Sequence, residues 1–147
     1  CEYIIFQNNG ATGSDAGVSS SANSVTLFQC VIHDVRGRGL TGSLRITCVE
    51  CETYNCNQSN TASTGAFHNT GAATFLRCIA HDNSGSNTNG FHSSGGAVSI
   101  CDCVADTNGN NGIAVSSSIA IVRGCDCYNN TSNGINFFSV GPAQIID

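Results

Sequence analysis

Three six-residue stretches decide the fold: CIAHDN at residues 78–83, CVADTN at 103–108 and CDCYNN at 125–130. Each begins with cysteine, has a second small residue two positions later, and ends in a polar pair closed by asparagine. Weaker copies of this pattern stand upstream, at residues 4–9, 30–35 and 51–56. The chain therefore contains an internal repeat, which is the first feature to establish in any sequence.

Other residues recur at corresponding positions in each copy of the repeat. The first residues of the copies, here called the anchors, lie 21–27 residues apart, at Ile4, Cys30, Cys51, Cys78, Cys103 and Cys125. A glycine and then a small or apolar residue follow each anchor, at Gly17-Val18, Gly39-Leu40, Gly65-Ala66, Gly90-Phe91, Gly112-Ile113 and Gly134-Ile135. Three residues before the anchors stand Cys1, Leu27, Cys48, Phe75, Ile100 and Val122. These rows predict one structural unit repeated six times.

Alternation of period two around each anchor places the anchor and the second residue after it on one face of a short strand. No copy has enough apolar residues to bury a core alone, so copies must stack about 4.8 Å apart and share one core. The polar pair suits a tight corner, where Asn and Asp tolerate left-handed dihedrals. We expect an all-β chain: a right-handed, single-stranded parallel β-helix, or solenoid, of about six coils. It forms a single domain over residues 1–147, either a segment of a longer solenoid or stackable into one.

With its C-x-A-x-x-N stretches followed by G-I or G-F and an apolar strand, the chain resembles the right-handed parallel β-helix repeat family of pectate-lyase-like and tailspike-like solenoids. The resemblance covers nearly the whole chain and implies the fold. Members of this family include polysaccharide lyases and hydrolases, epimerases, phage tailspikes and surface proteins, so the fold alone does not select a function.

Composition excludes several classes of function. Ten carboxylates stand against five arginines, giving a net charge of −5, and the chain contains no lysine. Such a surface would not attract a phosphate backbone, so we expect no nucleic-acid partner. No apolar run approaches the roughly 18 residues needed to span a bilayer. Ten cysteines in so short a chain would suggest the disulfide scaffold of a small secreted protein, but their positions follow the repeat instead. We expect an extracellular, cell-surface or virion-surface location.

The cysteines allow three interpretations. Five of them are anchors, which favours a buried ladder of thiols that act as small hydrophobic groups. Stacked neighbours would lie within the Cα distance range of disulfides, so bridges that involve Cys48, Cys56 or Cys101 remain open. A zinc site is disfavoured, because the CxxC at residues 48–51 and the CxC pairs at 101–103 and 125–127 belong to different coils. We therefore predict no metal and no cofactor.

The outward face of the anchor strands is the candidate ligand surface. One predicted row holds Gln7, His33, Tyr54, His81, Asp106 and Tyr128; the next holds Ile5, Val31, Glu52, Ile79, Val104 and Asp126; a third holds Tyr3, Gln29, Glu50, Arg77, Asp102 and Gly124. If the chain is an enzyme, the candidate catalytic residues are Asp102, Asp106, Asp126, Glu52 and His81, since carboxylates about 5–10 Å apart perform glycoside hydrolysis. If it binds carbohydrate, the candidate residues are Tyr54, Arg77, His81, Asp106 and Tyr128. Any exposed sheet must be polar, so both assignments compete with a purely structural explanation.

The last copy is followed by residues 143–147, which repeat the phase of residues 120–124. Neither end of the sequence contains an amphipathic helix or charged strand of the kind that caps a solenoid. We therefore expect a structural module of an extracellular filament, fibre or surface protein, non-enzymatic and self-assembling head to tail or as trimers. The alternative is a carbohydrate-binding or polysaccharide-cleaving β-helix with a polysaccharide partner. A third explanation is a repeat segment whose function lies in flanking domains.

Overall fold

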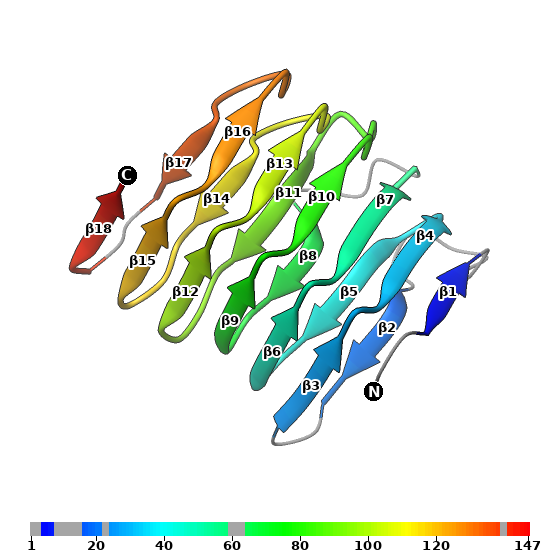
Figure 1. The fold of residues 1–147 in the computed structure, drawn as a ribbon, viewed down its shortest axis with the longest axis horizontal. Coiled ribbons are helices and arrows are strands. Elements are labelled where there is room, and N and C mark those ends of the chain that lie inside the picture. The colour runs from blue at the N-terminus through cyan, green and yellow to red at the C-terminus, as the bar shows by residue number, and fades with distance from the viewer. Residues whose placement is uncertain (1–3, 8–15, 22–23, 59–63, 139–140) are drawn as a thin grey trace.

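The computed structural model describes residues 4–7, 16–21, 24–58, 64–138 and 141–147. In these residues every regular element is a β-strand, and the strands form three parallel sheets of six strands each (Figure 1). The chain visits the three sheets in turn before it begins the next coil. The predicted all-β solenoid is confirmed, and its right-handed sense stays a prediction.

Sheet I carries the anchor copies. Its strands are β1 (Ile5–Gln7), β4 (Val31–Val35), β7 (Glu52–Cys56), β10 (Ile79–His81), β13 (Val104–Asp106) and β16 (Asp126–Tyr128). Sheet II contains β2 (Ala16–Ser20), β5 (Arg38–Gly42), β8 (Thr64–Asn69), β11 (Thr88–Ser93), β14 (Ile113–Val115) and β17 (Ile135–Phe137). Sheet III contains β3 (Ser24–Phe28), β6 (Arg45–Val49), β9 (Ala72–Leu76), β12 (Val98–Cys101), β15 (Ala120–Arg123) and β18 (Ala143–Ile146).

The register of sheet I is the one that the repeat predicts. His81 pairs with Tyr54 on one neighbouring strand and with Asp106 on the other. The anchors lie immediately before the strands, and Cys30, Cys51, Cys78 and Cys103 are at most 1% exposed. The inward row two residues later is buried as well, as Ile32, Thr53, Ala80 and Ala105 show.

The repeat position predicted at Gly65 is wrong by one residue. Phe67 of β8 pairs with Leu40 of β5 and with Phe91 of β11. Ala66, not Gly65, therefore occupies the row of Gly39 and Gly90. The error arises because glycine also recurs in the connecting loops, so it does not define how one coil aligns with the next. The buried residue of the strand defines that alignment.

Two left-handed turns bend each coil. The turn from sheet III into sheet I has φ between 51° and 55° at Gln29, Glu50, Arg77, Asp102 and Gly124. The predicted third row of the outward sheet is thus corrected: these residues form a corner beside sheet I. The turn after sheet I has φ between 50° and 54° at Asp34, Asn55, Asp82, Thr107 and Asn129. This second corner is the one predicted from the polar pair.

A buried asparagine ladder holds the second corner together. Asn83 Nδ2 donates to Asn108 Oδ1 at 2.9 Å, and Asn108 Nδ2 donates to Asn130 Oδ1 at 2.9 Å. Asn108 Nδ2 also donates to the Ala80 carbonyl at 3.0 Å. Because buried amides must be paired, each asparagine fixes the position of the next coil.

The structure contains a second ladder that the sequence interpretation missed. Asn111 Nδ2 donates to Asn89 Oδ1 at 2.9 Å, and Asn133 Nδ2 donates to Asn111 Oδ1 at 3.0 Å. Each of these asparagines directly precedes one of the repeat glycines. The recurring Asn-Gly pair was the signal that could have located this ladder.

Candidate functional site

The outer face of sheet I brings together the predicted rows of polar side chains. Tyr54, His81, Asp106 and Tyr128 share one row, in which successive residues are direct partners on neighbouring strands. Glu52 and Asp126 lie in the parallel row that also contains Ile79 and Val104. Both rows are confirmed, and they place these side chains on one surface.

His81 is the most constrained side chain of this face. Its Nδ1 lies 2.8 Å from Asp82 Oδ2, and its Nε2 lies 2.8 Å from Glu52 Oε1. Burial of the imidazole opposes protonation, but the hydrogen bonds and charges of the two carboxylates outweigh it and raise the pKa of His81. The three side chains therefore form a local ion-pair network when His81 is protonated.

Three rings stack along the same row. His33 and Tyr54 lie with centroids 4.6 Å apart and planes 8° apart, and Tyr54 and His81 lie 5.2 Å and 22° apart. Both faces of the Tyr54 ring are thus covered by its neighbours. A sugar ring cannot stack on Tyr54 in this arrangement, whereas Tyr128, further along the same row, is 50% exposed.

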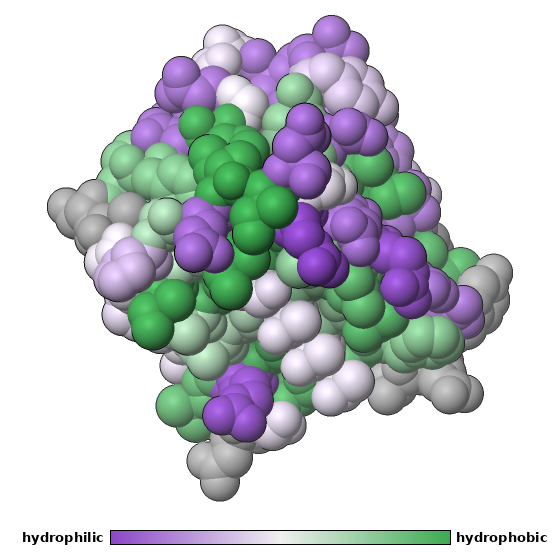
Figure 2. Space-filling model, turned by 60° about the vertical axis from the view of Figure 1, so that its left-hand side comes forward, coloured by the Kyte–Doolittle hydropathy of each residue, from purple (hydrophilic) through white to green (hydrophobic). Residues whose placement is uncertain are grey.

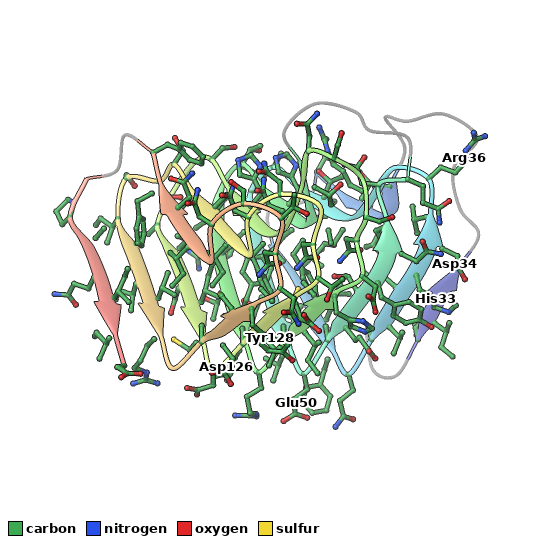
Figure 3. The ribbon with its side chains drawn as sticks, turned by 90° about the horizontal axis from the view of Figure 1, so that it is seen from above. His33, Asp34, Arg36, Glu50, Asp126 and Tyr128 are labelled. Atoms are coloured by element: carbon green, nitrogen blue, oxygen red, sulfur yellow. The ribbon has the colours of Figure 1, made fainter. Side chains whose placement is uncertain are left out.

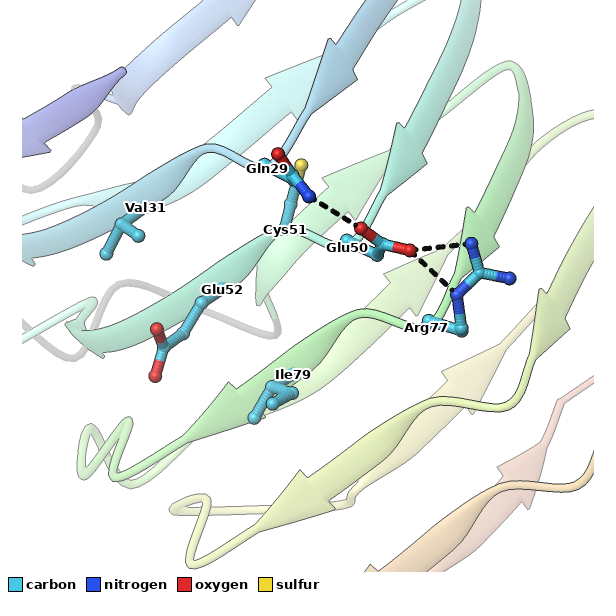
Figure 4. A pocket seen from close by; sticks show the side chains of 7 residues that line it. All are labelled: Gln29, Val31, Glu50, Cys51, Glu52, Arg77 and Ile79. Carbon is cyan, nitrogen blue, oxygen red and sulfur yellow. Dashed lines mark hydrogen bonds and ion pairs between the residues drawn. The ribbon is translucent and has the colours of Figure 1, made fainter. Parts of the chain in front are cut away.

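An open depression lies where sheet I meets its first corner (Figure 4). It has a volume of about 440 Å³ and is lined by Gln29, Val31, Glu50, Cys51, Glu52, Arg77 and Ile79. Arg77 donates to Glu50 Oε1 through Nε at 3.0 Å and Nη2 at 2.7 Å, and Gln29 Nε2 donates to Glu50 Oε2 at 2.9 Å. The hydrogen bonds from Gln29 and then from Arg77 lower the pKa of Glu50. Glu50 is therefore held as an anion, and its oxygens are already occupied.

The other predicted site residues do not reach this depression. Asp102, Asp106, Asp126 and Tyr128 belong to later coils, and Figure 3 shows Asp126 and Tyr128 well apart from His33 and Asp34. Asp106 Oδ1 accepts from Thr107 Oγ1 at 2.7 Å and from Asn129 Nδ2 at 3.3 Å. The five candidate catalytic residues are thus spread along the solenoid and do not surround one point.

Two carboxyl groups of the described residues have clearly shifted pKa values, and both shifts are downward. They are Glu50 and Asp34, whose pKa is lowered by hydrogen bonds from His33 and Asn55. A glycosidase needs a carboxylic acid with a raised pKa to protonate the leaving group. These two residues therefore suit ion pairing better than acid catalysis.

Searches of protein-family models, of curated proteins and of solved structures found no match to this chain. The described residues contain no cluster of three or more His, Cys, Asp or Glu side chains suited to a metal ion. Nor do they contain a helix long and apolar enough to cross a membrane. Inferences about function therefore rest on the geometry of the chain itself.

The anchor cysteines form a continuous inward row. Each of the five anchor thiols donates to the carbonyl oxygen two residues earlier, at 3.1–3.4 Å. Burial raises the pKa of Cys56 to about 12, and burial together with Cys125 and Asp126 raises that of Cys127 to about 12. These thiols serve as packing groups in this structure.

The coil formed by β16, β17 and β18 exposes residues that are buried in the other coils. Ile145 of β18 is 61% exposed, whereas Val122, its register partner on β15, is 1% exposed. All four residues of β18 are exposed, and Ile135 and Phe137 of β17 are half-buried. Figure 2, which turns the C-terminal side of Figure 1 forward, shows hydrophobic residues at the surface. This coil presents a sheet edge and an open section of core together.

Proposed function

We propose that this chain is a structural stacking module of an extracellular filament, fibre or surface assembly, in which copies join in register through their end coils. The exposure of Ile145 in a row that is otherwise buried carries the proposal. An apolar row that stops in solvent is completed most simply by the same row of a further coil.

The end strands carry little of the charge that normally prevents edge pairing, although β1, β16 and β17 are only three residues long. Natural sheet edges are protected by lysine, proline or inward-pointing charges. Strands β1, β2 and β3 contain no charged residue, and Asp126 is the one charged residue in β16, β17 and β18. These edges are therefore open to strand addition.

The rows of the two end coils also fit one another. Continuing the register places Ile145 above Leu27 and Ala143 above Val25, both apolar pairs. The same continuation places the large Phe137 above the small Ser20. Contact between two different ends of one molecule is heterologous, and it produces a filament when the rotation does not close a ring.

Ile145 and Ile146 provide a matched test. Ile145 points inward at the edge, whereas Ile146 is 44% exposed on the outer face of sheet III. Ile145→Lys should abolish the end-to-end filaments seen by electron microscopy and the large species seen in sedimentation velocity, because it places a charge in the buried contact. Ile146→Lys should leave end-to-end assembly intact. Filaments that survive Ile145→Lys, or wild-type protein that stays monomeric at high concentration, would contradict the proposal.

The carbohydrate-binding or polysaccharide-cleaving function stays a second prediction. The depression at Glu50 and Arg77 is open and combines charged side chains with Val31 and Ile79, which suits a ligand with both polar and apolar parts. The covered faces of Tyr54 and the dispersion of Asp102, Asp106 and Asp126 give it less support than the end coils give to assembly.

A further inference from the structure

The outer face of sheet III differs in chemistry from the rest of the solenoid. Its central row is mostly small and hydroxyl-bearing: Thr26, Thr47, Thr74, Ser99, Ile121 and Gln144. The row on one side is mainly apolar: Phe28, Val49, Leu76, Cys101, Arg123 and Ile146. On the other side lie Ser24, Arg45 and Ala72.

The carboxylates avoid this face. Those of the described residues lie on sheet I or in its two corners, at Asp34, Glu50, Glu52, Asp82, Asp102, Asp106 and Asp126, apart from Asp147, which directly follows β18. The chain as a whole carries a net charge of −5. Two copies would repel each other through sheet I, whereas the only charges on the three rows of sheet III are Arg45 and Arg123.

Large apolar side chains are exposed on and beside this face. Ile119 is 49% exposed, Ile121 37% and Ile146 44%, and Leu44, just before β6, is 44% exposed. A shallow depression of about 270 Å³ lies between β9, β12 and β15, and alanines and isoleucines form much of its lining. Contiguous apolar surface of this kind marks an interaction site.

We propose that the outer face of sheet III packs against the same face of a second copy of this chain. Two sheets pack face to face about 10 Å apart with their strands within about 30° of each other, and small side chains permit that approach. Six strands about 4.8 Å apart, each with four or five residues of about 3.3 Å, give a face of roughly 450 Å² per copy. The two copies together would bury about 900 Å², which is below the roughly 1,200 Å² of stable specific interfaces and within the range of weak, transient ones. The pairing between two unstacked copies is therefore weak and reversible.

This lateral pairing goes beyond end-to-end stacking and does not depend on it. In stacked assemblies the same face would repeat along the axis, and repetition would strengthen the lateral contact through multivalency. The inferred partner is a copy of this chain, because a carboxylate-free face on an acidic molecule removes the main barrier to self-contact.

The test uses Ile145→Lys as the background, so that end-to-end contacts do not contribute. Ile121 on sheet III and Ile79 on sheet I form a matched pair, with exposures of 37% and 40%. Sedimentation equilibrium should show a concentration-dependent dimer in the background protein and with Ile79→Lys. The dimer should be lost with Ile121→Lys, and also with Thr74→Lys in the centre of the face. Circular dichroism confirms that each variant is folded.

Several outcomes would overturn the pairing. A background protein that stays monomeric at every accessible concentration would show that the face takes a different partner. A dimer that survives both Ile121→Lys and Thr74→Lys, or that is lost with Ile79→Lys, would assign the contact to another surface. If the background still forms long assemblies, end-to-end stacking through Ile145 fails separately, and the sheet III variants still report on lateral contact.

Discussion

At the scale of single residues, the structure buries His68 of sheet II beside the half-buried His92, and neither belongs to the sheet I surface. His68 and His92 stack on neighbouring strands of sheet II with ring centroids 5.0 Å apart, and His68 is 7% exposed. The His68 Nδ1 lies 3.4 Å from Thr41 Oγ1, and His92 Nδ1 is buried without a hydrogen-bond partner within the described part of the chain. Burial, followed by the charges of His92 and Arg38, lowers the pKa of His68 to about 3.

This depressed pKa predicts acid sensitivity. A histidine whose folded pKa lies below its unfolded value near 6.5 contributes full stability above about pH 6.5 and loses it as the pH falls toward 3. Between pH 7 and pH 5, His68 should lower the free energy of unfolding by about 2 kcal/mol. His81 acts in the opposite sense, since its raised pKa adds stability at low pH that is lost as the pH rises.

The variant His68→Phe isolates this contribution. Urea denaturation should show that the free energy of unfolding changes less between pH 7 and pH 5 in this variant than in the wild type. The two changes should differ by about 2 kcal/mol. Asp34 and Glu50, whose pKa values are lowered, act at more acidic pH and do not interfere. An unchanged slope in His68→Phe would contradict a neutral, buried His68.

The sequence predicted residue positions better than residue environments. Glu52, Tyr54 and His81 were placed on one face because a strand has a strict period of two. The pairing of His81 with Glu52 and Asp82 depends on rotamers and a corner geometry that periodicity does not report. The burial of His68 was missed because an outward strand position gives no signal of what packs over it.

At the scale of elements, the strands were predictable and the first corner was not. Rows that recur every 21–27 residues define which residues stack. Left-handed φ at Gln29, Glu50 and Arg77 has no local signal, because only glycine, asparagine and aspartate favour that region. Tertiary pairing of the neighbouring strands imposes the turn on these residues.

The asparagine ladder predicts where the coils are most sensitive. Asn108 is 1% exposed and bonds to Asn83, Asn130 and the Ala80 carbonyl. Asn108→Ala should lower the free energy of unfolding by about 2–4 kcal/mol, since it leaves buried amide groups without partners. Asn110→Ala, two residues away in a half-exposed position, should change it by less than about 1 kcal/mol. Equal effects of the two changes on urea denaturation would rule out a stabilising ladder.

At the scale of the whole molecule, the solenoid separates its chemistry by face. Sheet I and its corners carry the described carboxylates apart from Asp147, sheet III carries apolar and hydroxyl rows, and the coil of β16, β17 and β18 exposes its core. The phase of residues 143–147 predicted that they continue the rows of residues 120–124, and β18 pairs with β15 in that register. The contrast between sheets I and III follows from the same rows, but the rows alone do not show which apolar residues face solvent; the exposures in the structure do.

The central claim is that copies of this chain continue one another's sheets. Cryo-electron microscopy of assembled protein tests it most directly. Six strands per sheet at about 4.8 Å predict a filament with an axial rise of about 29 Å per copy, in which Ile145 of one copy lies on Leu27 of the next. Monomers alone, or an assembly in which the edge of β18 faces solvent, would contradict it.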